Sequence, residues 1–149
     1  MNPTIDFATL QDLPAMADLL HELFTLESDF QPERAHQLAG LQTILDTPTI
    51  GRLFVLRIEG KVVGMANALI TVSTALGTPV VLLEDVIVSK AQRGDGLGRR
   101  LVEHVFDWAK AQGMSRVTLL ADENNTTALA FYAKLGFKKS AMVVRRKQL

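Results

Sequence analysis

Three glycines at every second position, Gly94, Gly96 and Gly98, separate an apolar run from a strongly amphipathic segment. The apolar run at 80–88 has the length and the β-branched content of a buried strand, and the segment 97–112 has apolar residues at helical spacing. Glycine permits positive φ angles and a close approach of the backbone to a ligand. The pattern therefore predicts a strand–turn–helix unit with an exposed, glycine-rich turn between the two elements.

Further strands and helices are expected around this unit. Period-two alternation predicts a strand at 53–58, a tight turn at Glu59-Gly60 and a partner strand at 61–71. Helical spacing predicts three more helices, and short apolar or alternating runs predict three more strands. These helices are expected at 13–24, 32–45 and 124–135, and these strands at 5–7, 116–121 and 137–145. Strands and helices alternate in the second half, which favours an α/β architecture with a parallel β-α-β unit over 80–121.

Length and charge narrow the class of protein. The 149 residues suit a single domain, 1–149. Lys plus Arg and Asp plus Glu each total 16, so the chain lacks the basic excess typical of nucleic-acid binding. The sequence contains no cysteine, its three histidines are scattered, and its apolar runs are far shorter than the about 20 residues of a membrane helix. We expect a cytoplasmic protein with no metal site, no nucleic-acid partner and no membrane partner.

The glycine-rich turn is also a candidate anion site. The first N–H groups of a helix have no intrahelical acceptor, and the helix dipole favours negative charge near them. Arg93, Arg99 and Arg100 add positive charge, so a diphosphate is a suitable ligand. A turn that merely reverses the chain is the alternative. Neither the Walker loop nor the dinucleotide fingerprint fits the spacing of the glycines.

The spacing Arg93-x-x-Gly96-x-Gly98 resembles the signature of the GNAT superfamily of N-acetyltransferases, Gln/Arg-x-x-Gly-x-Gly/Ala at a helix start. A second pattern of that family, Asn-x-x-Ala-x-x-Phe-Tyr-x-Lys-x-Gly-Phe, matches the run from Asn125 to Phe137. The resemblance covers roughly 53–137. It implies a GNAT-type α/β fold: a mixed, mostly antiparallel twisted sheet with helices on both faces and a parallel β-α-β core that binds the cofactor.

The resemblance also implies acetyl-CoA as the acyl donor and a role for each matching position. Main-chain groups of Val86, Ile87 and Val88 would pair with the pantetheine arm, and Asn125 would hydrogen-bond near the thioester. Tyr132, the only tyrosine, would protonate the departing thiolate, for which a phenol with a pKa of about 10 is suitable. A packed aromatic of the helix is the alternative for Tyr132. The pyrophosphate would lie on the backbone of Arg93, Gly94, Asp95, Gly96, Leu97, Gly98 and Arg99.

An amine acceptor requires a base, because an amine is protonated at neutral pH and cannot attack in that form. Glu84 is the first candidate and Asp85 the second. Consecutive residues of a strand point to opposite faces, so we expect only one of the two to face the site. The pair Asp122-Glu123 is a third option. The purely structural alternative is a buried acid paired with an arginine of the last strand, Arg145 or Arg146.

We therefore expect an enzyme that moves an acetyl group from acetyl-CoA to a primary amine of a small molecule. Direct attack is favoured, because no Cys and no Ser–His–Asp pattern supports a covalent intermediate. The runs 83–88 and 122–124 are similar to those of glucosamine-phosphate N-acetyltransferases, which favours a small amine or amino-sugar acceptor. The alternatives are a protein N-terminus, lysine or aminoacyl-tRNA as acceptor, and a catalytically silent acyl-CoA-binding regulatory module.

The C-terminal region departs from the family pattern. Many members have two strands after the tyrosine helix, whereas only twelve residues follow Phe137. The sheet is then one strand short, or a neighbouring subunit completes it. An uncovered edge strand favours association, so a homodimer is expected.

Overall fold

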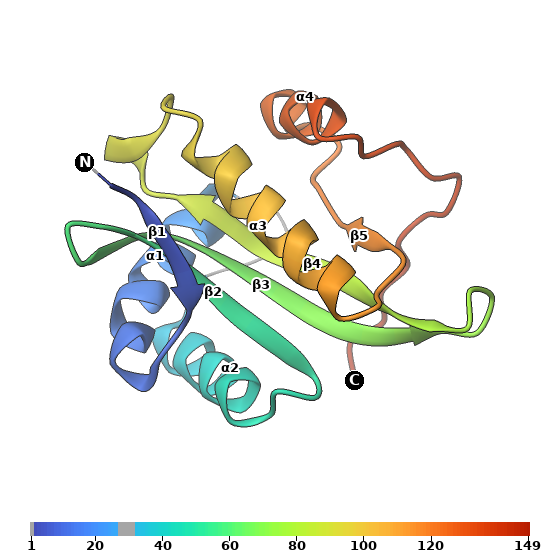
Figure 1. Ribbon diagram of the computed structural model, residues 1–149, viewed down its shortest axis with the longest axis horizontal. Coiled ribbons are helices and arrows are strands. Elements are labelled where there is room, and N and C mark those ends of the chain that lie inside the picture. The colour runs from blue at the N-terminus through green and yellow to red at the C-terminus, as the bar shows by residue number, and fades with distance from the viewer. Residues whose placement is uncertain (1, 27–31) are drawn as a thin grey trace.

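A computed structural model describes residues 2–26 and 32–149, in which a five-stranded sheet is flanked by helices on both faces (Figure 1). The strands are β1 (Thr4–Phe7), β2 (Gly51–Ile58), β3 (Lys61–Ser73), β4 (Thr78–Val88) and β5 (Val117–Leu119), and they lie in that order. Strands β1 to β4 pair in antiparallel fashion, and β5 pairs parallel to β4. The predicted mixed, mostly antiparallel α/β fold is thereby confirmed.

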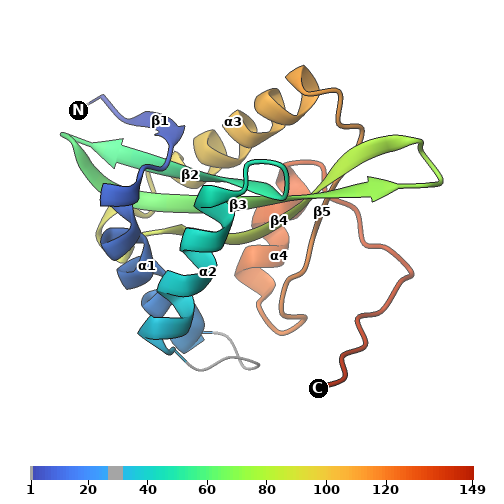
Figure 2. The same cartoon turned by 90° about the horizontal axis from the view of Figure 1, so that it is seen from below.

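Two apolar cores lie on the two faces of the sheet. Helices α1 (Leu13–Leu26) and α2 (Arg34–Asp46) cover one face, and α3 (Leu97–Ala111) covers the other (Figure 2). The short helix α4 (Thr126–Lys134) follows β5, and two 3-10 turns precede α1 and α3 at Leu10–Asp12 and Lys90–Gln92. No helix among the described residues is both long enough and apolar enough to cross a membrane.

The predicted hairpin and the predicted strand–turn–helix unit are both present. Glu59 and Gly60 have positive φ angles of 52° and 77°, as a two-residue turn between antiparallel strands requires. Strand β4, helix α3 and strand β5 form the parallel β-α-β unit. Strand β5 is shorter than expected and comprises only three residues.

The final strand predicted at 137–145 is absent. No described residue after α4 belongs to a strand, and Met142 and Val143 are 90% and 70% exposed. The apolar run there is typical of a strand, but a strand needs a partner edge, and β5 offers only three residues for pairing. Five cations in the last twelve residues repel one another and further disfavour a compact ladder.

A buried ion pair ties the start of α1 to the sheet. Both guanidinium Nη atoms of Arg57 on β2 donate to the Asp12 carboxylate, at 2.7 and 2.6 Å. The backbone N–H of Thr9 donates to the same carboxylate at 2.8 Å, as part of a capping box at the start of the 3-10 turn. The hydrogen bond from Arg57 is the main cause that lowers the pKa of Asp12, whose side chain is 7% exposed.

Asp12→Asn is predicted to lower the free energy of unfolding by about 2 kcal/mol at neutral pH, because it removes a charge-assisted hydrogen bond from a buried site. A carboxyl whose pKa is lowered by folding stabilises the fold above its ordinary pKa, and this stabilisation is lost as the pH falls through the lowered value. The stability difference between wild type and variant should therefore shrink below about pH 4. Urea unfolding over a pH series measures it, and a difference independent of pH would contradict the assignment.

Candidate active site

Strand β4 is interrupted by a bulge. Between the cross-strand pairs Asn67–Glu84 and Met65–Ile87, two residues of β4 stand opposite one residue of β3. The first of these two, Asp85, has a φ of 54°, a left-handed conformation that is rare for a residue with a side chain. Such bulges occur next to active sites, because the extra residue bends the strand and redirects its side chains.

The bulge brings both candidate acids to the same face of the sheet. Residues paired across antiparallel strands share a face, so Glu84 shares that of Asn67. Asn67 lies two residues from Met65, which packs under α1 and α2. The Nδ2 of Asn67 donates to Oδ2 of Asp85 at 3.2 Å. The expected alternation of Glu84 and Asp85 between opposite faces is therefore wrong at this position.

Burial raises the pKa of both acids. For Glu84 the largest cause is desolvation, the negative charge of Asp85 raises the pKa further, and the positive charge of Arg146 opposes both. For Asp85 desolvation also dominates, and the hydrogen bond from Asn67 opposes it. The alternative reading expected a buried acid paired with Arg145 or Arg146. Arg146 does lower the pKa of Glu84 through its positive charge, although it lies in a segment without strand structure.

Beyond the bulge, β4 diverges from β5. The parallel ladder joins only residues 81–83 of β4 to 117–119 of β5. The N–H of Ser89 donates to the carbonyl of Val63 on β3 at 2.7 Å. Because hydrogen bonds alternate between the two edges of a strand, the main-chain groups of Val86 and Val88 are directed to the opposite edge, where β5 has ended. An extended ligand can therefore pair with β4 in this opening.

The turn before α3 leaves open space beside its backbone. Gly94 and Gly96 have φ angles of 96° and 74°, and a Cβ built on either would meet no atom within 4 Å. The carbonyl of Gly96 accepts from the N–H of Arg100 at 3.2 Å, so the helix ladder begins there. The N–H groups that precede Arg100 in the first turn have no intrahelical acceptor. This cradle fits a diphosphate.

Gly98 has a different role from the other two glycines. A Cβ at this position would lie 3.4 Å from the ring of Phe131 on α4 and 3.9 Å from Val88. These are ordinary van der Waals distances, so an alanine would fit at this position without displacing α4. The third glycine of the motif therefore has neither the positive φ nor the open space of the other two.

Two of the three arginines around the turn are paired with carboxylates. The Nε of Arg99 donates to Glu103 one helical turn later at 2.6 Å. The Nη2 of Arg93 donates to Glu22 of α1 at 2.7 Å, and its Nε donates to the carbonyl of Val88 at 2.9 Å. The side chain of Arg93 therefore braces the turn, and it occupies one of the main-chain acceptors expected to pair with pantetheine.

Asn125 and Tyr132 lie at the two ends of α4. Asn125 is the N-cap, and its Oδ1 accepts from the N–H of Ala128 at 3.1 Å, so the structure explains its side-chain oxygen as a cap. The ring of Tyr132 is half-buried and makes edge contacts with Phe131 and Phe137, at centroid distances of 5.1 and 5.6 Å. The aromatic packing considered for Tyr132 is present, and its catalytic role stays a prediction.

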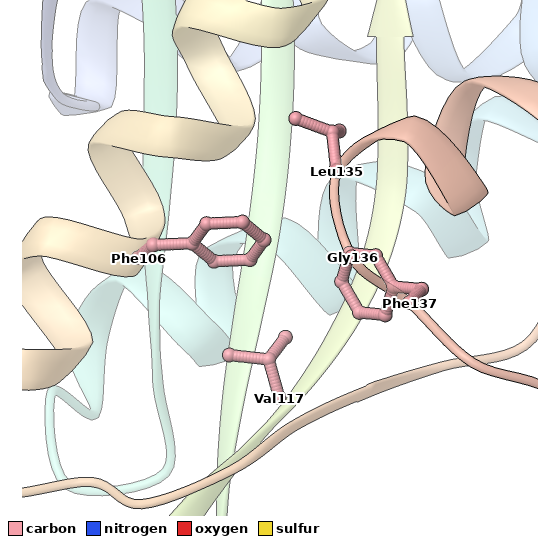
Figure 3. A pocket seen from close by; sticks show the side chains of 5 residues that line it. All are labelled: Phe106, Val117, Leu135, Gly136 and Phe137. Carbon is pink, nitrogen blue, oxygen red and sulfur yellow. The ribbon is translucent and has the colours of Figure 1, made fainter.

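A shallow, open cavity of about 220 Å³ lies between α3, β5 and the end of α4 (Figure 3). It is lined by Phe106, Val117, Leu135, Gly136 and Phe137. None of these residues was predicted to take part in the site, and none carries an ionisable group. We attribute the cavity to the incomplete cover of β5 and place no chemistry in it.

Known proteins resemble this chain over most of its length. The model of the acetyltransferase (GNAT) family matches residues 13–137. The chain belongs to the GNAT acetyltransferase family. This membership confirms the expected enzyme class, an acetyl-CoA-dependent N-acyltransferase, and the resemblance on which that expectation depended.

Individual relatives agree with this assignment. An IAA acetyltransferase from Azospirillum brasilense is 35% identical over 86% of this chain and 78% of that protein. A glucosamine 6-phosphate N-acetyltransferase from Trypanosoma brucei brucei is 33% identical over 60% of this chain and 59% of that protein. Against several other curated relatives the chain covers 15% to 40% of their length. A solved Trypanosoma brucei acetyltransferase superposes with a TM-score of 0.77 at 26% identity and covers 99% of this chain and 100% of that one.

Asp85→Asn is predicted to lower the pKa of Glu84, because it removes a neighbouring negative charge, whereas Arg146→Gln is predicted to raise it. Asparagine tolerates the left-handed conformation, so the bulge should persist in the first variant. Titration of the Glu84 carboxyl carbon by NMR measures both changes. Lys147→Gln is the control, because it also removes one positive charge but at the neighbouring position, and it should leave the pKa of Glu84 unchanged. Shifts of the same sign in all three variants would refute this account.

Proposed function

We propose that this protein transfers the acetyl group of acetyl-CoA to a primary amine of a small molecule by direct attack. The observation that carries the proposal is the junction of β4 with α3. Three features adjoin one another at this junction, along residues 84–98. They are a strand edge that pairs with no other strand, a glycine turn with exposed N–H groups, and two acids with raised pKa. The open space beside Gly94 and Gly96 supports a bound diphosphate.

The proposed reaction exchanges one bond for another. The coenzyme supplies an acetyl thioester, and the amine nitrogen forms a bond to the acetyl carbon while the carbon–sulfur bond breaks. The amine loses one proton, and the thiolate gains one. The chain must therefore provide a proton acceptor near the amine and a proton donor near the sulfur. Positioning of the two reactants supplies most of the remaining rate enhancement.

Glu84 is the proposed base, with Asp85 as the second candidate. A raised pKa makes a carboxylate a better proton acceptor than an ordinary glutamate at neutral pH. Asp85 is engaged by Asn67, whereas no side-chain hydrogen bond to Glu84 occurs within the described part of the chain. The Asp122-Glu123 pair follows β5 and stays a third option.

The family relatives support a small acceptor. The trypanosomal relative is named for glucosamine 6-phosphate, an amino sugar. The balance of 16 basic and 16 acidic residues in this chain offers no excess charge for an aminoacyl-tRNA. A thiol-release assay with acetyl-CoA over amines, amino sugars, polyamines and peptides tests the proposal. Turnover on peptides alone would replace the small-molecule acceptor by a protein acceptor.

Tyr132→Phe is predicted to lower turnover about 100-fold, because it removes the proposed proton donor to the thiolate. The ring contacts with Phe131 and Phe137 persist in phenylalanine, so folding and binding of CoA should be retained. Calorimetry with CoA provides the control, and the thiol-release assay measures the effect. Unchanged turnover with intact binding would remove Tyr132 from the mechanism.

We also propose a homodimer in which the C-terminal segment of one subunit covers the β5 edge of its partner. Among the described residues, β5 has no strand on its outer side. The apolar side chain of Leu120, before α4, and those of Met142 and Val143, after α4, are exposed. Burial of these side chains together with the open strand edge would favour association.

Val143→Asp is predicted to weaken the dimer, because it places a charge in the proposed contact. Leu10→Asp is the control, since Leu10 is also exposed, at 55% against 70% for Val143, and follows β1, the strand at the opposite edge of the sheet. Sedimentation velocity over a concentration series measures the association. A monomeric wild type, or equal effects of the two variants, would exclude this interface.

A further inference from the structure

One carboxylate connects helix α1 to the turn before α3. The Oε1 atom of Glu22 accepts from Nη2 of Arg93 at 2.7 Å and from the backbone N–H of Lys90 at 3.2 Å. The same guanidinium donates through Nε to the carbonyl of Val88 at 2.9 Å. We call this set of contacts the Glu22–Arg93 latch. It joins α1, the end of β4 and the 3-10 turn at Lys90–Gln92.

The latch places a negative charge next to a proposed anion site. A carboxylate near bound phosphates repels them, so simple electrostatics makes Glu22 unfavourable for the coenzyme. Its side chain is 33% exposed, and that of Arg93 is 43% exposed, so solvent weakens the ion pair only in part. Glu22 also accepts a hydrogen bond from the backbone N–H of Lys90 in the 3-10 turn. An isolated ion pair on the surface has no such second partner.

We propose that Glu22 is a positioning residue that holds the turn between β4 and α3 in the shape that receives the diphosphate. In this role Arg93 is a strut between Glu22 and the Val88 carbonyl, and its side chain is not a phosphate ligand. The inference depends on the proposed function and assigns to that site a residue outside its sequence motifs. The ordered turn means that less conformational entropy is lost when the coenzyme binds.

The latch and simple electrostatics predict opposite signs for Glu22→Gln. Removal of the negative charge alone would tighten the binding of a phosphorylated ligand. Loss of the latch weakens it, because the turn must then be ordered at the moment of binding. We expect the Kd for CoA to rise about two- to fivefold, the range of a partly exposed ion pair.

The kinetic signature follows the same reasoning. The KM for acetyl-CoA should rise with kcat retained, because Glu22 does not touch the reacting atoms. The KM for acetyl-pantetheine, which carries no diphosphate, should stay unchanged, and a general defect in folding would not spare it. Arg93→Lys keeps the charge but loses the Nε contact to Val88, so it should weaken CoA binding to a similar extent.

Glu103→Gln is the matched control. It removes a comparable carboxylate–arginine pair, with side chains 47% and 57% exposed, but this pair joins two residues of α3 and does not connect the turn to α1. Calorimetry with CoA should show no loss of affinity in this variant. Equal or tighter CoA binding by Glu22→Gln, or equal losses with acetyl-pantetheine, would overturn the latch. A wild-type protein that binds no CoA would instead overturn the proposed function.

Discussion

The extra residue in β4 is the constraint on which the site depends. Without it, the alternation of β4 would continue past Glu84, and Asp85 would point to the face covered by α3. With it, Asp85 takes a φ of 54° and receives a hydrogen bond from Asn67, on the face that Glu84 occupies. The ladder with β5 ends at residue 83 just before the bulge, so the strand edge beyond it is open. One backbone irregularity thus brings the two acids to one face, and the end of β5 leaves the opening beside them.

The acids of this chain fall into two groups with opposite pKa shifts. The Arg57 guanidinium lowers the pKa of Asp12, so the ionised form of Asp12 stabilises the fold at neutral pH. Burial raises the pKa of Glu84 and Asp85, so their contribution to stability has the opposite sign and improves as the pH falls through the raised values. The fold therefore tolerates an unfavourable pair of charges at the site. Such a cost is expected where acids serve chemistry rather than stability.

Local patterns predicted the elements that local physics determines. The β2–β3 hairpin follows from alternation and its two-residue turn, and α3 follows from its apolar spacing and the glycines before it. The strand predicted at 137–145 was wrong, because its formation depends on the length of the partner edge as well as on its own residues, and β5 is only three residues long. The bulge is a property of the register between β3 and β4, and the sequence predicted a plain alternation of Glu84 and Asp85 at this position. The contact of Glu22 with Arg93 spans 71 residues, and neither position signals it.

The charges around the glycine turn indicate how this site would recognise phosphate. Arg93 and Arg99 are engaged by Glu22 and Glu103, so much of their positive charge is compensated before any ligand arrives. The groups that remain for the ligand are chiefly the N–H dipoles at the start of α3 and the part of the open β4 edge that Arg93 does not occupy. These groups are fixed in direction by the backbone and need no reordering of long side chains. Recognition of this kind depends on the shape of the turn, which gives the Glu22 carboxylate a role beside an anion site even though its charge is unfavourable there.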